Sequence, residues 1–300
     1  MSKKISFGIN KYFHKRILNL ALRYIKLEAL TYPCFGLVSK KDSGCHYDMD
    51  IKTFLISQKT FKFYFKEIYI LIIKNSDLDF LSLRKLGQKQ EKRMFKVTNN
   101  VNTHKGLIFV FGIIYYISLY GFFHKISFDL WSFLIKKITK PLVNDFQKLN
   151  FQSKSKQIFT KFKILGARGE ALSGYSVIFN KGLPFLKYYS NKYPQLTQEN
   201  KCLLLLIFYL AEIDDTTLIF KIGYYKSQEI KQKAKEWLNI LFLKGWKTFY
   251  KVILKNNDIY KKNKVSPGGC ADLCVVTLFL SYFYKKYDKN ITIFNLKHKF

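Results

Sequence analysis

Acidic residues are scarce in this 300-residue chain: 20 Asp and Glu stand against 52 Lys and Arg, which gives a formal net charge of +32. Such an excess points to a polyanionic partner, for example nucleic acid, an anionic membrane or a phosphorylated substrate. The basic residues are spread along the whole chain, whereas a nucleic-acid site usually gathers them in a compact stripe. A drift of composition toward Lys, Ile, Phe, Tyr and Asn is the simpler explanation, so charge alone assigns no function.

Paired cysteines and a leader sequence are also missing. The chain has no CxxC motif and an odd number of dispersed cysteines, which disfavours both a zinc ribbon and a disulfide framework. The first 20 residues carry scattered charges and no continuous apolar stretch, unlike a signal peptide. We therefore expect a cytoplasmic protein with reduced thiols. The cysteines are Cys34, Cys45, Cys202, Cys270 and Cys274.

Long uncharged runs are rare, with one exception at residues 106–123, GLIFVFGIIYYISLYGFF. These 18 residues reach the lower length limit of a membrane-spanning helix. The alternative is a helix buried on all sides at the centre of a helical domain. Its glycines and hydroxyl groups reduce its apolarity, and we favour the buried helix.

Apolar residues recur with helical periodicity, and strand and turn signals are few, so we predict a single all-α domain over residues 1–300. Residues 58–73 test this prediction, because their aromatic and β-branched content is typical of a strand. A loop is expected within the polar residues 75–100. Helices are expected over 10–30, 48–74, from about 103, 131–140, 196–213, 227–243 and 267–287, with a polar stretch at 147–157 and another helix after it.

Small and polar residues interrupt this texture in four stretches: GCHYDMD (44–50), NTHKG (102–106), GARGEALSG (166–174) and SPGGCADL (266–273). A weaker fifth, DDTTLIFKIG, covers 214–223. In this order and spacing they resemble the triphosphoribosyl-dephospho-CoA synthase family. The likeness includes ALTYPCFGLVSKKDSG (29–44) and GLP (182–184) and extends from about residue 20 to residue 285.

The resemblance implies an all-helical transferase with ATP and 3′-dephospho-CoA as substrates. In that family the 2′-hydroxyl of 3′-dephospho-CoA attacks C1 of the ATP ribose and displaces adenine. The product passes to a transferase system that modifies an apo-acyl carrier protein, and Mg²⁺ is expected to accompany ATP. Neither nucleic acid nor a membrane is an expected partner.

Two of the motifs have the form of a helix start, where free N–H groups bind anions. Thr103 and Ser266 are the expected N-caps, and Arg168 offers a two-donor fork for phosphate. The residues predicted to bind substrate and phosphate are Lys40, Asn102, Thr103, His104, Lys105, Gly106, Arg168, Gly169, Lys221, Ser266, Gly268 and Gly269.

Displacing adenine requires proton transfer and stabilisation of an oxocarbenium-like ribose. The predicted catalytic residues are Glu170, Asp48, His46 and Asp272. Asp48 and Asp215 are the predicted Mg²⁺ ligands, because Mg²⁺ prefers oxygen donors and bridges phosphates.

Each assignment has a structural alternative. Asp48 would then cap its helix, His104 would be a core histidine, and Arg168 and Glu170 would pair with other side chains. The chain also departs from the family pattern. Phe35, Ser39, Lys221 and Ile222 replace residues that the family usually has as Pro, Asp, Arg and Gly. A nucleotide-binding member without turnover, or a basic nucleic-acid-binding protein, are therefore the alternative functions.

Overall fold

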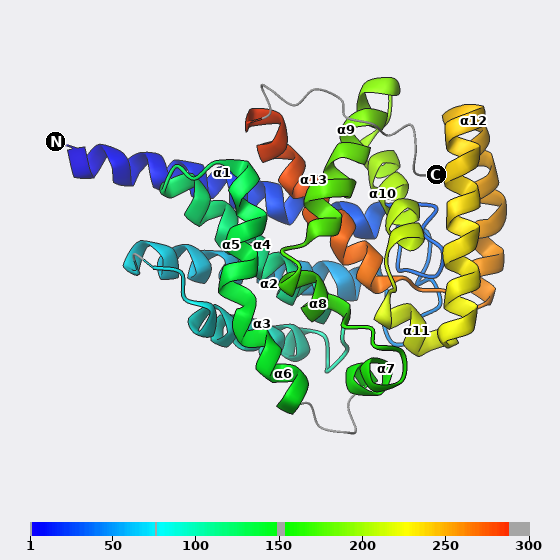
Figure 1. Cartoon of the computed structure of the whole chain (residues 1–300), viewed down its shortest axis with the longest axis horizontal. Helices are drawn as coiled ribbons and strands as arrows, with labels where there is room; N and C mark the ends of the chain where they lie inside the picture. Colours follow the sequence, from blue (N-terminus) through cyan, green and yellow to red (C-terminus); the bar gives the residue numbers. More distant parts are fainter. Residues whose placement is uncertain (1, 76, 149–153, 288–300) are drawn as a thin grey trace.

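The structure is a computed structural model that describes residues 2–75, 77–148 and 154–287. Every regular element in these ranges is a helix, so the predicted all-α fold is confirmed (Figure 1). The longer helices are α1 (Ser2–Leu30), α2 (Ile51–Lys74), α3 (Phe80–Val97), α4 (Lys105–Phe123), α10 (Gln198–Glu212), α12 (Tyr224–Lys262) and α13 (Gly268–Tyr287). Between them lie α5 (Trp131–Thr139), α6 (Val143–Lys148), α7 (Lys154–Phe162), α8 (Gly166–Leu172), α9 (Leu183–Lys192) and α11 (Thr216–Ile222), with short turns η1 (Phe128–Leu130), η2 (Lys140–Leu142) and η3 (Ile178–Gly182).

The centre of the fold is made of helices that are apolar on every side. In α4 the buried positions run almost without interruption from Leu107 to Leu119, and in α10 from Cys202 to Ala211. α13 packs against both of them and against α1. Of the described helices, α4 alone is long and apolar enough to cross a membrane, and 72% of its apolar window is buried inside the protein. The predicted central buried helix is confirmed.

Amphipathic helices surround this centre. Residues 58–73 lie inside α2, so the helical prediction holds there despite the strand-like composition: Phe61, Phe65 and Ile68 face inward at helical spacing. The loop expected within 75–100 is confined to the ends of that range, at 77–79 and 98–100, because α3 occupies the residues between them. Asp79 caps α3 by accepting from the Ser82 N–H at 2.9 Å, and the polar residues of α3 cover its solvent face.

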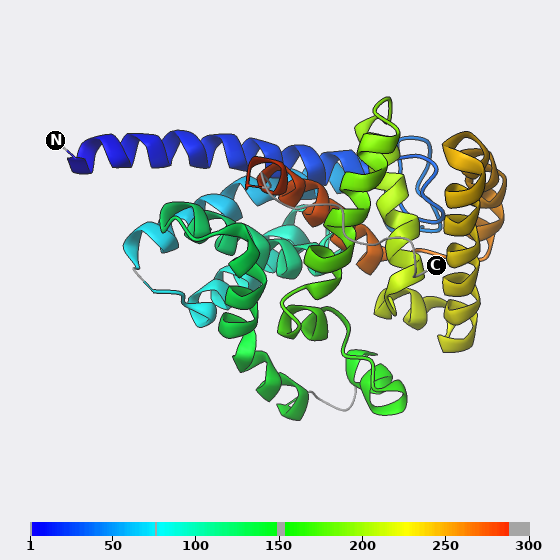
Figure 2. The ribbon, with the colours of Figure 1, turned by 45° about the horizontal axis from the view of Figure 1, so that its top comes forward.

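α12 is a helical hairpin. Gly245 has φ 77° and ψ 178°, outside the helical region, and glycine tolerates that positive φ. The Trp237 and Tyr260 rings lie 5.3 Å apart, whereas a straight helix would separate these residues by roughly 35 Å. The two halves stand side by side at one edge of the molecule (Figure 2). This edge supports the loop that leads to the first polar motif.

Candidate active site

A cavity of about 540 Å³ gathers four of the polar stretches. Gly106 comes from the start of α4, Gly169 and Glu170 from α8, and Gly269 and Asp272 from the start of α13. Asp214, Asp215, Thr216 and Thr217 contribute the segment that enters α11, and residues 162–165 close another side. Residues that are far apart in the chain therefore meet in one polar cavity, at the N-terminal ends of several helices.

Two carboxyl groups dominate the chemistry of this cavity. The pKa of Asp272 lies well above its ordinary value, because burial disfavours the charged form and because Glu28 and Asp215 are close. Burial also raises the pKa of Glu170, although Lys181 opposes that shift. Gly106 lets the Asp272 carboxyl approach the backbone of α4, since a Cβ at this position would collide with Asp272 Oδ2. The cavity therefore holds two carboxyl groups whose pKa values are both raised by burial.

Asp215 joins the two helix starts beside the cavity. Its Oδ1 accepts hydrogen bonds from the Thr217 and Leu218 N–H groups of α11, at 2.8 and 3.1 Å. Its Oδ2 accepts from the Cys270 N–H in the first turn of α13, at 2.9 Å. Asp215 is thus a shared cap, and Ser266, the expected cap of α13, does not have that role.

A second group of predicted residues lies next to the cavity. His46 Nε2 is 3.1 Å from Ser266 Oγ and 3.3 Å from Lys221 Nζ. Asp48 Oδ1 is 3.8 Å from His46 Nδ1. Burial, and then the neighbouring Lys221 ammonium, lower the pKa of His46 to about 4, while Asp48 opposes the shift. His46 is therefore neutral near pH 7, and Lys221 supplies the positive charge of this cluster.

Asp48 does not cap its helix. The N-cap of α2 is Asp50, whose Oδ1 accepts from the Thr53 N–H at 2.8 Å and from the Thr53 hydroxyl at 2.7 Å. The carboxylate of Asp48 is 41% exposed beside His46. The capping alternative for Asp48 is wrong, and its carboxylate stays available to solvent or a ligand.

Arg168 points away from the main cavity, unlike its neighbours Gly169 and Glu170. Its Nε lies 3.3 Å from Asp145 Oδ2, and it lines a separate cavity of about 200 Å³. Asp145 also receives a two-bond contact from Arg84, at 3.1 and 2.9 Å. Two guanidinium groups thus share one carboxylate, so the structural pairing weighed for Arg168 is present and a surplus positive charge remains.

Of the NTHKG motif, His104 is buried, whereas Asn102, Lys105 and Gly106 are exposed. His104 is the N-cap residue of α4 in place of Thr103, and its side chain makes no capping bond. Its Nδ1 contacts Ser57 Oγ at 2.8 Å, and burial lowers the pKa of His104 to about 3. Asn102 Oδ1 accepts from the Lys105 N–H at 3.1 Å, and Lys105 Nζ pairs with Glu91 at 3.1 Å. Of this motif, Gly106 alone lines the main cavity.

The remaining predicted residues lie close to the cavity or on the surface. Gly268 lies against Thr217, which itself lines the cavity. Lys40 pairs with Glu199 at 2.7 Å on the surface. Ile222 packs against the main core at the end of α11. The roles of these residues toward a substrate stay predictions.

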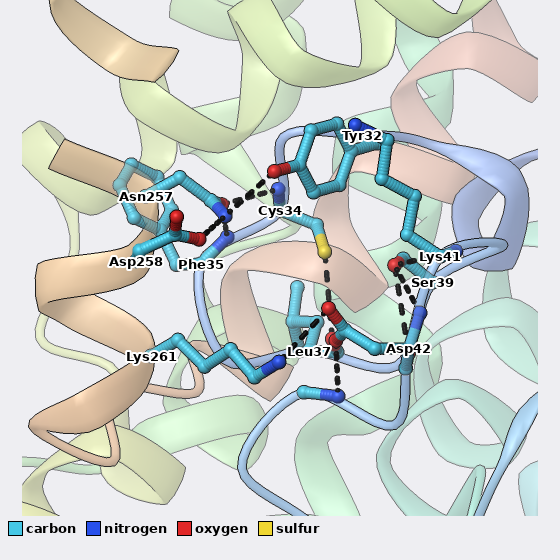
Figure 3. A network of polar contacts seen from close by, with 11 residues as sticks. Tyr32, Cys34, Phe35, Leu37, Ser39, Lys41, Asp42, Asn257, Asp258 and Lys261 are labelled. Atoms are coloured by element: carbon cyan, nitrogen blue, oxygen red, sulfur yellow. Dashed lines mark hydrogen bonds and ion pairs between the residues drawn. The ribbon is translucent and has the colours of Figure 1, made fainter. Parts of the chain in front are cut away.

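The departures from the family pattern in the 29–44 loop are accommodated locally. Figure 3 shows this loop held by the returning half of α12: Asn257 Oδ1 accepts from the backbone N–H groups of Cys34 and Phe35, at 3.1 and 2.8 Å. The Phe35 ring stacks on Trp237 at 5.6 Å. Ser39 Oγ accepts from the Lys41 and Asp42 N–H groups, at 3.2 and 3.4 Å. The substituted residues thus fix the loop in place.

The predicted magnesium ligands do not form a ready-made metal site. Both carboxylate oxygens of Asp215 are engaged by backbone N–H groups. The Lys221 ammonium raises the local positive charge near both Asp48 and Asp215. Among the described residues, no three His, Cys, Asp or Glu side chains are arranged to hold an ion.

Sequence reasoning missed two buried groups. Burial raises the pKa of Glu28, at the end of α1, to about 8. Tyr175 lines the main cavity and is fully buried, and its hydroxyl has no hydrogen-bond partner. Glu28 adjoins the ALTYP stretch and Tyr175 follows GARGEALSG directly, so proximity to a polar motif was the available signal.

In the part of the chain that the structure describes, an all-helical fold places a polar, carboxylate-lined cavity at the starts of several helices, which suits a polar ligand. The chain belongs to the ATP:dephospho-CoA triphosphoribosyl transferase family, whose model matches residues 14–291. It is therefore a transferase.

Named relatives agree with this assignment. The protein CitXG of Leuconostoc mesenteroides subsp. cremoris is 33% identical over 89% of this chain, which spans 58% of that protein. A probable 2-(5″-triphosphoribosyl)-3′-dephosphocoenzyme-A synthase of Streptococcus equi subsp. equi is 31% identical, over 94% of this chain and 98% of the relative. One of the same description from Streptococcus pyogenes serotype M18 is 29% identical, over 90% and 97%. No solved structure matches the chain.

Proposed function

We propose that this chain transfers the triphosphoribosyl group of ATP to the 2′-hydroxyl of 3′-dephospho-CoA. The observation that carries the proposal is the convergence of family motifs on one cavity with Glu170 and Asp272 in its wall. The bond from C1 of the ribose to the adenine nitrogen breaks, and a bond from the same carbon to the 2′-oxygen forms. The hydroxyl loses one proton and the departing adenine gains one.

The two carboxyl groups suit these two proton transfers. Asp272, whose pKa is raised well above its ordinary value by burial, is the proposed donor of the proton to adenine. Glu170, whose pKa burial also raises while Lys181 opposes the shift, is the proposed base that accepts the hydroxyl proton. An ionised Glu170 also favours the positive charge that develops on the ribose.

The basic cluster beside the cavity is the proposed phosphate site. Lys221 carries its positive charge, and His46 and Ser266 provide polar atoms around the ammonium. Mg²⁺ enters this proposal as the counter-ion of the triphosphate. Asp48, with its exposed carboxylate, is the better placed of the two predicted ligands. The product would pass to the apo-acyl-carrier-protein transferase system in a reducing cytoplasm.

The test is release of free adenine from ATP in the presence of Mg²⁺ and 3′-dephospho-CoA, followed by chromatography. We expect wild-type turnover, and a fall of roughly 10²–10⁴ in kcat for Glu170→Gln with ATP still bound. Glu236→Gln is the matched control, because Glu236 pairs with Lys233 on the surface. A wild-type protein that binds ATP but releases no adenine would identify a family member without turnover. Steeply salt-dependent binding of DNA or RNA, with neither ATP binding nor adenine release, would favour a nucleic-acid-binding protein.

A further inference from the structure

Tyr175 is an unusual residue for a protein core. Its side chain is fully buried and its hydroxyl has no hydrogen-bond partner. A buried hydroxyl without a partner destabilises the folded state, and phenylalanine would fill the same space without that cost. The backbone of Tyr175 also has φ 52°, in the left-handed region that side chains rarely adopt. Two unfavourable features therefore coincide at one residue of the cavity wall.

The surroundings of Tyr175 connect it to Glu170. The Tyr175 N–H donates to the Glu170 backbone oxygen at 2.7 Å, at the end of α8. Both residues line the same cavity. Asp272, from the 266–273 motif, lines it as well. The acidic groups that act on the Tyr175 phenol are Glu170 and then Asp272, and Tyr64 is the other titratable neighbour. The phenol thus lies within electrostatic range of the two carboxyl groups assigned to proton transfer.

We propose that Tyr175 is a positioning residue that donates a hydrogen bond to the Glu170 carboxylate once substrate is bound. This inference rests on the proposed function. A donor held ready beside the base would orient Glu170 and favour its ionised form. In the free protein the hydroxyl stays unpaired, which lowers the stability of the folded state. The donor is, however, already in place when substrate binds.

The test compares Tyr175→Phe with Tyr115→Phe. Tyr115 is a matched control, because it is also fully buried with an unpartnered hydroxyl but stacks on Phe65, at 4.2 Å, inside the core. Removing either hydroxyl should raise Tm by roughly 2 °C. Tyr175→Phe alone should lower kcat/KM for adenine release by about ten-fold, because a bond to a charged group is lost.

The pH profile of kcat, which reports pKa values in the substrate complex, provides a readout that a purely structural role would not move. Glu170 is faced by Tyr175 and Tyr209 and by Lys181, which also pairs with Glu212. Losing the Tyr175 donor should raise the pKa of Glu170 and move the acidic limb upward by about one pH unit. Unchanged rate and profile in Tyr175→Phe, beside an active wild type, would overturn this inference alone. No adenine release from wild type would overturn the proposed function and this inference with it.

Discussion

The Cys270 N–H donates to Asp215 Oδ2 at 2.9 Å, across 55 residues of sequence. The same carboxylate caps α11 through the Thr217 N–H. One side chain therefore fixes the angle between two helix starts whose residues line the cavity. This arrangement predicts a structural role for Asp215, although the sequence pattern suggested a metal ligand.

Asp215→Ala should reduce stability, because α11 loses its cap and the buried Cys270 N–H loses its acceptor. Loss of the cap costs about 1 kcal/mol, and the unpaired N–H adds roughly 1–3 kcal/mol. Urea denaturation at pH 7 measures the sum. A variant of wild-type stability whose activity responds only to higher Mg²⁺ concentrations would instead support the metal-ligand prediction.

Substitutions at Arg168 and at Asp145 distinguish phosphate binding by Arg168 from a structural ion pair between the two residues. If the surplus positive charge beside Asp145 binds a substrate phosphate, Arg168→Lys should lower kcat/KM about ten- to hundred-fold, because the planar fork is replaced by a point charge. Asp145→Asn should then leave the rate unchanged or raise it. The structural alternative predicts a lower Tm in both variants and normal kinetics in the folded fraction. Tm and adenine release, measured on the same samples, distinguish the two.

Lys221 depresses the pKa of His46, and this effect can be measured without turnover. Lys221→Met should move the His46 pKa upward from about 4 toward its ordinary value of 6.5, although burial still holds it down. NMR titration of the imidazole protons reports the shift. Lys181→Met, which removes a lysine paired with Glu212, is the control and should leave His46 unchanged. An unshifted His46 signal in Lys221→Met would show that the two side chains do not interact in solution.

Stability should fall on acidification below about pH 6.5 because of buried histidines. The pKa of His14 and of His46 is lowered to about 4, and that of His104 to about 3, in each case mainly by burial. The unfolded chain therefore binds more protons between these values and 6.5, and unfolding is favoured as pH falls. Urea midpoints at pH 7 and pH 5 should differ accordingly. His124, which is not a buried residue, offers a control: His124→Gln should retain the difference.

Glu28 predicts the opposite dependence. Its pKa is raised from 4.5 to about 8, so the folded state holds a proton that the unfolded state releases. This difference does not lower the free energy of unfolding below pH 4.5, and it lowers it increasingly as pH rises toward 8. Glu28→Gln should therefore raise Tm at pH 8 and change it little at pH 5. An equal Tm change at both values would show that packing, and not ionisation, governs this position.

The sequence predicted the fold well, because apolar periodicity and uniformly apolar runs decide which helices form and which are central. It failed at α3, where polar residues concealed a one-sided apolar face anchored by Phe80 and Met94. Residues of the 102–106, 166–174, 214–223 and 266–273 motifs line the main cavity, whereas none of 44–50 does. The sequence did not predict the direction of each side chain. Gly169 and Arg168 are adjacent on α8, yet they line different cavities. Tyr175 was missed because an unpaired hydroxyl is a property of three-dimensional surroundings.

The hydrogen bonds from the loop of Figure 3 to Asn257 can form only after Asn257 has left the ribosome. The loop that precedes His46 leaves the ribosome long before Asn257, Ser266 and Cys270 do. Early helices such as α1 and α2 can pair while synthesis continues. The candidate pocket, in contrast, cannot be completed until α13 is released, because Gly269 and Asp272 form part of its wall. A nascent chain that stops before α13 would therefore be compact in part but would lack the complete pocket.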